Sequence, residues 1–152
     1  MRISYTTQNI NNILCCKVSI INCSDKEVEK KTYENFIAFW NKLYTENKFF
    51  CFLFDASQLT QTSSYYCYKI ASFIKSFKKQ KIQFLKFSII IISNSFVRYL
   101  FNVIMQIEKP LNTVYIVNSI NQGNELLDYK TSDSILLKSF LLINKIKVID
   151  PD

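Results

Sequence analysis

Two uninterrupted apolar runs constrain the fold of this chain more than any other feature. Residues 49–54 and 87–92 are apolar almost throughout, and a helical pattern from about residue 63 to residue 81 separates them. Strands that helices cover on both faces show continuous rather than alternating apolar residues. The order strand, helix, strand therefore predicts two neighbouring interior strands of a parallel sheet.

The rest of the chain predicts a mixed sheet with helices on its faces. Two β-rich segments, residues 3–7 and 13–20, are separated by asparagines, which tolerate the left-handed backbone of a hairpin turn. Ser24 and Glu27 have the spacing of a capping box that would open the first helix. We expect helices at 24–47, 63–81, 95–108, from Ser119 onward and at 135–146, a short strand at 113–117, and a tail at 148–152.

These elements together predict an α/β fold with a mixed, mostly parallel central sheet of about five strands covered by helices. At 152 residues the chain is long enough to bury a core of its own. We expect an α/β domain at residues 1–129 and a C-terminal helical extension at 130–152 that packs on the same domain.

Composition excludes several functional classes. The chain has no histidine, which removes Ser-His and Cys-His nucleophile pairs and every zinc site that requires imidazole. Its single glycine excludes Gly-rich phosphate-binding loops. We therefore expect a protein that is not an enzyme and that binds no metal and no cofactor.

Charge and cysteine content bear on partners and location. The formal net charge is +7, which favours an acidic partner, and an anionic membrane surface stays open as one. Phenylalanines that alternate with lysines in residues 75–86 fit the core better than nucleic-acid stacking, so we do not expect nucleic-acid binding. Five cysteines without a signal-like N-terminus or a membrane span indicate reduced thiols and an intracellular, cytoplasmic protein.

The order of elements and two local motifs resemble the STAS domain, the fold of sulphate transporters and anti-sigma-factor antagonists. Residues 52–57 (FLFDAS) are similar to the family's apolar strand ending in Asp-Leu-Ser, and residues 114–119 (VYIVNS) to the closing strand of its SEC14-like branch. The resemblance covers roughly residues 3–129. It implies a protein-interaction role and a serine that is phosphorylated at the start of the second helix.

The segment that corresponds to the phosphorylated motif departs from the family pattern. Residues 61–66 read QTSSYY, so a tyrosine stands where the family has glycine. Ser63 and Ser64 are the candidate phosphorylation sites. Their alternative role is to cap the helix.

Polar residues follow the predicted strands and could form a ligand site. In open α/β sheets, ligands bind outside the carboxyl ends of the strands. The alternative is that these residues cap helices and close turns. The candidate ligand-binding residues are Asp55, Ser57, Asn94, Ser95 and Asn118.

The helix expected at 95–108 is apolar on nearly all sides. A helix of this kind is either deeply buried or in contact with a partner. The candidate interface residues, which lie away from its core face, are Phe96, Tyr99, Val103 and Met105. We therefore expect a non-enzymatic STAS-like interaction module that could form a dimer, and as the alternative a domain that binds a small ligand or a lipid head group at the strand ends.

Overall fold

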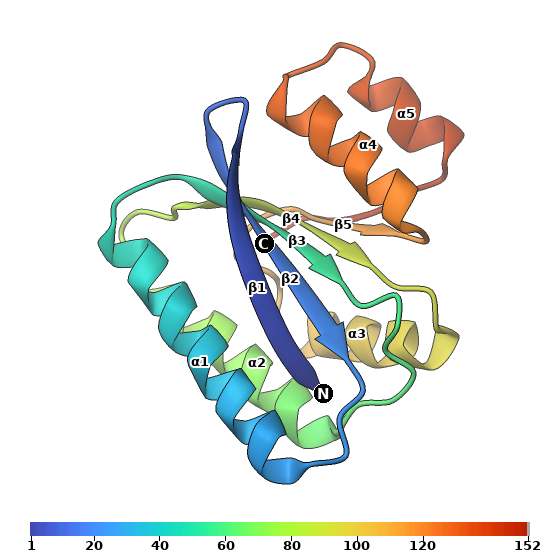
Figure 1. Cartoon of the computed structure of the whole chain (residues 1–152). Helices are drawn as coiled ribbons and strands as arrows, with labels where there is room; N and C mark the ends of the chain where they lie inside the picture. The colour runs from blue at the N-terminus through green and yellow to red at the C-terminus, as the bar shows by residue number, and fades with distance from the viewer. Residues whose placement is uncertain (152) are drawn as a thin grey trace.

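The computed structural model describes residues 1–151, except for the side chains of Ser64 and Cys67, and it has an α/β fold built on one mixed sheet (Figure 1). The strands lie in the sheet in chain order. The first two are antiparallel, the second to the fifth are parallel, and the last is antiparallel to the fifth. The strands are β1 (Arg2–Ile10), β2 (Ile13–Ile21), β3 (Phe50–Asp55), β4 (Leu85–Ile91), β5 (Val114–Val117) and β6 (Lys147–Ile149).

Helices cover both faces of this sheet, but unequally. Each of the first three helices connects adjacent parallel strands. Such crossover connections are right-handed, so successive connections in the same direction across the sheet place their helices on the same face. The last two helices lie together on the opposite face (Figure 1). The helices are α1 (Lys26–Thr45), α2 (Ser64–Phe77), α3 (Ser95–Ile107), α4 (Ile120–Thr131) and α5 (Leu137–Ile143).

The two apolar runs are interior strands, as the sequence predicts. Phe50 and Phe52 on β3 point into the cluster under α1, α2 and α3, whereas Cys51 points into the cluster under α4 and α5. On β4, Ile89 and Ile91 belong to the α4 side and are fully buried. Because side chains on a strand alternate between faces, burial on both faces requires the continuous apolar pattern.

The first hairpin closes through a two-residue turn. Ile10 pairs with Ile13, and the two residues between them, Asn11 and Asn12, have φ values of 50° and 68°. Two positive φ values in a two-residue loop are typical of a type I′ turn, in which asparagine is one of the favoured residues. The predicted asparagine hairpin is confirmed.

Several predicted boundaries are wrong. The cap of α1 is Asp25 rather than Ser24, because the Asp25 carboxylate accepts hydrogen bonds from the backbone N–H groups of Glu27 and Val28. Helix α2 ends at Phe77 rather than near residue 81, and α5 is shorter than the expected helix. The expected tail contributes to β6, which pairs with β5 and brings the sheet to six strands, and residue 129 lies inside α4.

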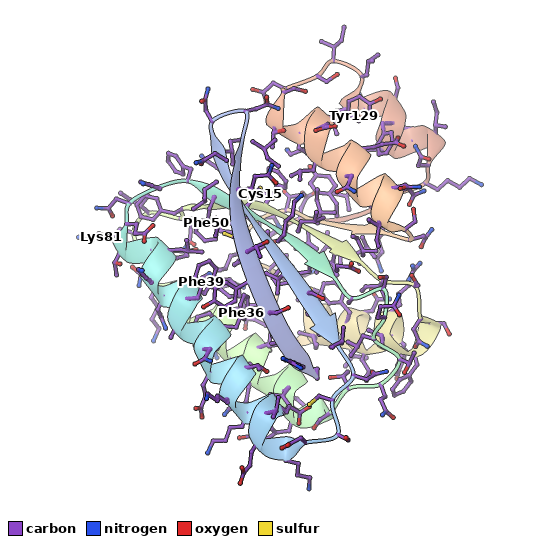
Figure 2. All side chains as sticks on the ribbon, viewed as in Figure 1. Cys15, Phe36, Phe39, Phe50, Lys81 and Tyr129 are labelled. Carbon is purple, nitrogen blue, oxygen red and sulfur yellow. The ribbon has the colours of Figure 1, made fainter. Side chains whose placement is uncertain are left out.

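The core on the side of α1, α2 and α3 is rich in aromatic rings. Phe36 and Phe39 of α1 lie between that helix and the sheet (Figure 2). The Trp40 ring lies 4.9 Å from those of Phe52 and Phe73, in edge-to-face contacts that stabilise aromatic clusters. The rings do not fill this layer completely, since an apolar cavity of about 160 Å³ lies between the sheet and the three helices.

No helix within residues 1–151 has the length and apolar character needed to span a membrane.

Candidate interaction surface and polar strand ends

Helix α3 starts at a well-formed cap. The side-chain oxygen of Asn94 accepts hydrogen bonds from the backbone N–H groups of Phe96, at 3.0 Å, and Val97, at 3.1 Å. These bonds satisfy two N–H groups that a helix N-terminus otherwise leaves free. At the other end, Glu108 forms an ion pair with Lys78, which follows α2. The N-terminus of α3 is therefore capped locally, and its C-terminus is tied to the end of α2.

One side of α3 belongs to the core. Val97, Ile104 and Met105 are buried, and the partly buried Phe101 packs against the same cluster. Leu100 lines the apolar cavity together with these residues. This side of the helix packs into the shared core cluster, and α2 is its neighbouring helix there.

The opposite side of α3 carries an exposed apolar stripe. Phe96, Tyr99 and Ile107 are 51%, 63% and 55% exposed, and Val103 between them is partly exposed. Spacings of three and four residues place these side chains in one row along a helix. We name this row the α3 stripe: Phe96, Tyr99, Val103 and Ile107.

The surface around the α3 stripe has no charged side chain on the helix itself. The other outward residues are Ser95, Asn102 and Gln106. The only charged residue within α3 is Arg98, and its guanidinium turns to the sheet, where it donates to the carbonyl oxygen of Ile92 at 2.7 Å and to the side-chain oxygen of Asn118. An exposed helix face without charges is unusual on a chain with net charge +7.

The α3 stripe includes three of the four candidate interface residues. Phe96, Tyr99 and Val103 lie on it, but Met105 is only 6% exposed and forms part of the core, so its assignment to a surface is wrong. Ile107 was missed because it also continues the spacing of the core residues Val97 and Ile104. Its distance of four residues from Val103 was the signal that could have found it.

The polar strand-end residues are mostly engaged in local hydrogen bonds. The Asp55 carboxylate accepts from the backbone N–H of Ser57 at 3.0 Å and from its hydroxyl at 2.6 Å. Asn94 caps α3, Asn118 accepts from Arg98, and Ser95 is exposed at the first turn of α3. Sequence reasoning did not place Arg98 among these residues, because it lies inside a helical pattern rather than at a strand end.

Asp55 also lines an open groove on the sheet face that carries α4. Helix α4 lies over β3, β4 and β5 and leaves the surface of β1 and β2 uncovered. The groove has a volume of about 340 Å³. Its polar lining residues include Ser4, Thr6, Lys17, Ser19, Asp55 and Asn124.

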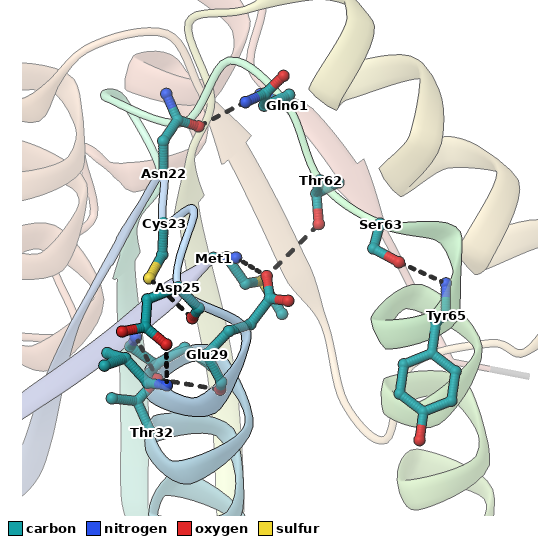
Figure 3. A network of polar contacts seen from close by, with 12 residues as sticks. Met1, Asn22, Cys23, Asp25, Glu29, Thr32, Gln61, Thr62, Ser63 and Tyr65 are labelled. Atoms are coloured by element: carbon teal, nitrogen blue, oxygen red, sulfur yellow. Dashed lines mark hydrogen bonds and ion pairs between the residues drawn. The ribbon is translucent and has the colours of Figure 1, made fainter.

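The segment before α2 is held against the N-terminus of the protein (Figure 3). The Thr62 hydroxyl donates to the sulfur of Met1 at 3.9 Å, and the Met1 amino group forms an ion pair with Glu29 of α1. The side-chain oxygen of Asn22 also accepts from the backbone N–H of Thr60. Ser63 is exposed and caps α2, because its hydroxyl oxygen accepts from the backbone N–H of Tyr65 at 3.1 Å. The side chain of Ser64 lies outside the described part of the structure.

The cysteines at the centre of the sheet are buried thiols. Cys15 and Cys51 are neighbours in the register of β2 and β3, and a hydrogen bond between them lowers the pKa of Cys15 and raises that of Cys51. Burial raises the pKa of Cys16 to about 12. Among the described residues, no group of three or more metal-ligating side chains is close enough to hold an ion.

Comparison with protein-family models, with curated proteins and with solved structures finds no match to this chain. The resemblance to the STAS domain therefore stays a prediction.

Proposed function

We propose that this protein is a non-enzymatic, STAS-like interaction module that forms a homodimer through the α3 stripe. The observation that carries the proposal is the row of Phe96, Tyr99, Val103 and Ile107 on a helix face that has no charged side chain. Apolar rows of this kind, rimmed by polar residues, mark sites of protein–protein contact. Asn102 and Gln106 supply the polar rim, and the Lys147 ammonium group donates to the side-chain oxygen of Asn102 at 2.9 Å.

The chemistry of the stripe suits a second copy of the same chain. A twofold interface brings each residue close to its own copy or to a neighbour on the same patch, so like charges there would repel. The outward side chains of α3 carry no charge although the chain has a net charge of +7, and the ammonium group at their border, that of Lys147, is engaged by Asn102. Apolar residues spaced along a helix also match the ridges that helices use when they pack together.

The proposal includes an intracellular location and the absence of catalysis. The odd number of cysteines favours a reducing compartment, and the lack of histidine removes the commonest general acid–base group. It does not include nucleic-acid binding. Phe77, which alternates with lysines in sequence, is buried in the core and is not available for stacking on bases.

Size-exclusion chromatography with light scattering tests the dimer. We expect the wild-type protein to have twice the chain mass of 17.9 kDa, and the variant Tyr99→Asp to have the mass of one chain. Tyr68→Asp is the matched control, because Tyr68 is 60% exposed on α2 and lies outside the stripe. A wild-type protein that is monomeric at every concentration, or a Tyr68→Asp variant that dissociates as Tyr99→Asp does, contradicts the proposal.

The alternative function is binding of a small ligand or lipid head group at the strand ends. The groove of about 340 Å³ that Asp55 and Lys17 line favours it, because it offers one anionic and one cationic group on a wall of hydroxyl side chains. Thermal-shift measurements with nucleotides and phospholipid head groups test it. A ligand of the groove would raise the melting temperature of the wild-type protein. This shift should disappear in Lys17→Met and remain in Lys31→Met, on the outer side of α1. If none of the compounds raises the melting temperature, the result contradicts this alternative.

A further inference from the structure

Helix α5 is held to the protein by only one of its sides. Phe140 is buried, and its ring lies 5.0 Å from that of Tyr129 on α4. Leu137 and Leu141 pack against the same cluster. These contacts lie on the side of the helix that faces α4 and the sheet.

The other side of α5, with the turn before it, exposes large aliphatic side chains. Ile135 is 94% exposed and Ile143 is 79% exposed, and Leu136 and Leu142 are also exposed. Exposed fractions this high require that almost no protein atoms lie beside the side chain, so these residues protrude. We name them the α5 patch: Ile135, Leu136, Leu142 and Ile143.

The α5 patch combines the outer side of the helix with the turn before it. Successive residues of a helix are separated by about 100°, so Leu142 and Ile143 are neighbours on α5, and Ile135 and Leu136 lie in the turn directly before its first residue. Phe140 and Leu141 fall on the opposite side, in agreement with their burial. The segment therefore has two apolar faces, one in the core and one in solvent.

Lysines outnumber acidic residues in and around the α5 patch. Residues 133–146 contain Lys138 and Lys145 and one acidic residue, the exposed Asp133 in the turn before α5. Lys138 lies in the first turn of α5, and Lys145 lies in the turn that directly follows the helix, where its φ is 50°. Each is exposed, so both ammonium groups are free to approach an anionic surface.

We propose that the α5 patch docks the protein on an anionic lipid bilayer. Aliphatic side chains beside lysines are the composition by which surface helices enter the boundary between head groups and acyl chains. Lysines near such a surface each contribute about 1 kcal/mol through the negative lipid charge. A bilayer accommodates protruding side chains, whereas a protein partner would need a groove shaped to receive them.

This site is independent of the α3 stripe. Helix α3 packs on one face of the sheet and α5 on the other, by way of α4 (Figure 1). Dimerisation through the stripe therefore leaves the α5 patch free, and a dimer would present two copies of it. Failure of the dimer proposal would leave the membrane proposal intact, because a monomer carries the same patch.

Vesicle co-sedimentation with the full chain tests the proposal. We expect binding to vesicles of phosphatidylcholine with one third phosphatidylserine, and at least tenfold weaker binding to phosphatidylcholine alone. The double variant Leu142→Ser with Ile143→Ser should lose binding to both kinds of vesicle. Its urea midpoint should equal that of the wild type, because both side chains are exposed.

Charge reversal distinguishes a localised site from attraction by net charge. Lys138→Glu with Lys145→Glu should weaken binding to the phosphatidylserine vesicles by at least tenfold. Lys30→Glu with Lys31→Glu, on the exposed side of α1, changes the net charge equally and should bind as the wild type does. Equal loss in both double variants would overturn the proposal, since it would show that only the overall charge matters.

A fluorescent reporter gives a second readout. Ile135→Trp places an indole at the most exposed position of the patch, and the native Trp40 is buried and contributes a constant background. We expect a blue shift of the added emission on the phosphatidylserine vesicles. If the protein neither sediments with the vesicles nor shows the blue shift, the α5 patch is not a membrane site. If the protein self-associates without lipid, and Leu142→Ser with Ile143→Ser abolishes this self-association, the patch is a protein contact. Either result would overturn membrane docking.

Discussion

Gly123 of α4 lies directly against the side chain of Ile91 on β4. A Cβ atom on Gly123 would lie 3.0 Å from Cδ1 and 3.1 Å from Cγ1 of Ile91. Ile91 is almost fully buried, so it has little room to move away. The only glycine of the chain therefore sets how closely α4 approaches the sheet.

Substitution of Gly123 tests this close approach. Alanine gains up to about 1 kcal/mol in helix propensity, but overfilling a packed core costs about 1–3 kcal/mol. We expect Gly123→Ala to lower the free energy of unfolding by roughly 1 kcal/mol and Gly123→Val to lower it by more than 2 kcal/mol. Urea unfolding measures both. Asn124→Ala, at the next and exposed position of α4, is the control, and an increase in stability with Gly123→Ala would contradict the prediction.

The hydrogen bonds of Arg98, which lie at the carboxyl ends of β4 and β5, should contribute to stability. Its guanidinium donates to the backbone of Ile92 and to the side chain of Asn118. Arg98→Met keeps most of the aliphatic stem and should lower the free energy of unfolding by about 1.5–3 kcal/mol, the usual range for a hydrogen bond to a charged group. Asn118→Ala removes part of the same interaction. The loss of unfolding free energy in the double variant should therefore be smaller than the sum of the losses in the two single variants, as a double-mutant cycle would measure.

The turn between β1 and β2 should depend on a residue that accepts positive φ. Asn12 has a φ of 68°, in the left-handed region. Asn12→Ala should lower the free energy of unfolding by about 1 kcal/mol, whereas Asn12→Gly should retain the stability of the wild type. Chemical denaturation of both variants measures the difference. Equal stabilities for alanine and glycine would show that the turn does not hold this conformation in solution.

Thiol labelling should separate the cysteines by burial. Cys15, Cys16 and Cys51 are buried, and Cys23 is partly exposed. The thiolate is the reactive form, and burial raises the pKa of Cys16 to about 12. Among these four thiols, we expect an alkylating reagent under native conditions to modify Cys23 first, and the three buried ones only as fast as the protein unfolds. Peptide mass spectrometry over time measures this, and rapid modification of Cys16 would be inconsistent with the structure.

Stability should fall in alkaline solution. Burial raises the pKa values of Tyr33 and Tyr44 from 10 to about 12. A group whose pKa is higher in the folded state favours folding below its unfolded pKa, and this contribution disappears as the pH rises through the folded pKa. Ionisation of each tyrosine should therefore lower the free energy of unfolding between pH 10 and pH 12, by less than the roughly 2–3 kcal/mol that 1.36 kcal/mol per pKa unit gives, because solvent screens part of the interaction.

Substitution of Tyr44 identifies its share of this pH dependence. Tyr44→Phe removes the hydroxyl, which donates to the side-chain oxygen of Gln83 at 2.8 Å, and it should reduce the loss of stability between pH 10 and pH 12. Tyr68→Phe, at an exposed position of α2, should leave the pH profile unchanged. Thermal unfolding across this range measures both. Profiles that coincide for the wild type and Tyr44→Phe would mean that this hydroxyl is already free to ionise.

Local sequence patterns were sufficient to predict a structural element where the residues of that element alone determine its conformation. The continuous apolar runs predicted β3 and β4 because burial on both faces leaves no polar position on a strand. Ser119 was correctly identified as a cap, since its hydroxyl accepts from the backbone N–H of Gln122, three residues away. Asn11 and Asn12 indicated the turn because asparagine tolerates the left-handed backbone.

Local sequence patterns failed where contacts with residues far away in the sequence determine the structure. β6 is only three residues long, and it is a strand because Val114 of β5 pairs with Ile149. Met105 and Ile107 are both apolar, and contact with the core decided that one is buried and the other exposed. Asp25 rather than Ser24 caps α1, although both residue types favour this position.

The sequence by itself determined the α/β class, the order of the main elements and the exclusion of histidine-dependent chemistry, because periodicity and composition are properties of short segments and of residue counts. Only the tertiary structure decided that Arg98 reaches Asn118, that the α3 stripe and the α5 patch stay exposed, and that Asp55 lines a groove. These features depend on which surfaces meet across the sheet. Burial of one apolar face rather than another is a balance of contacts over the whole molecule, and no single segment encodes it.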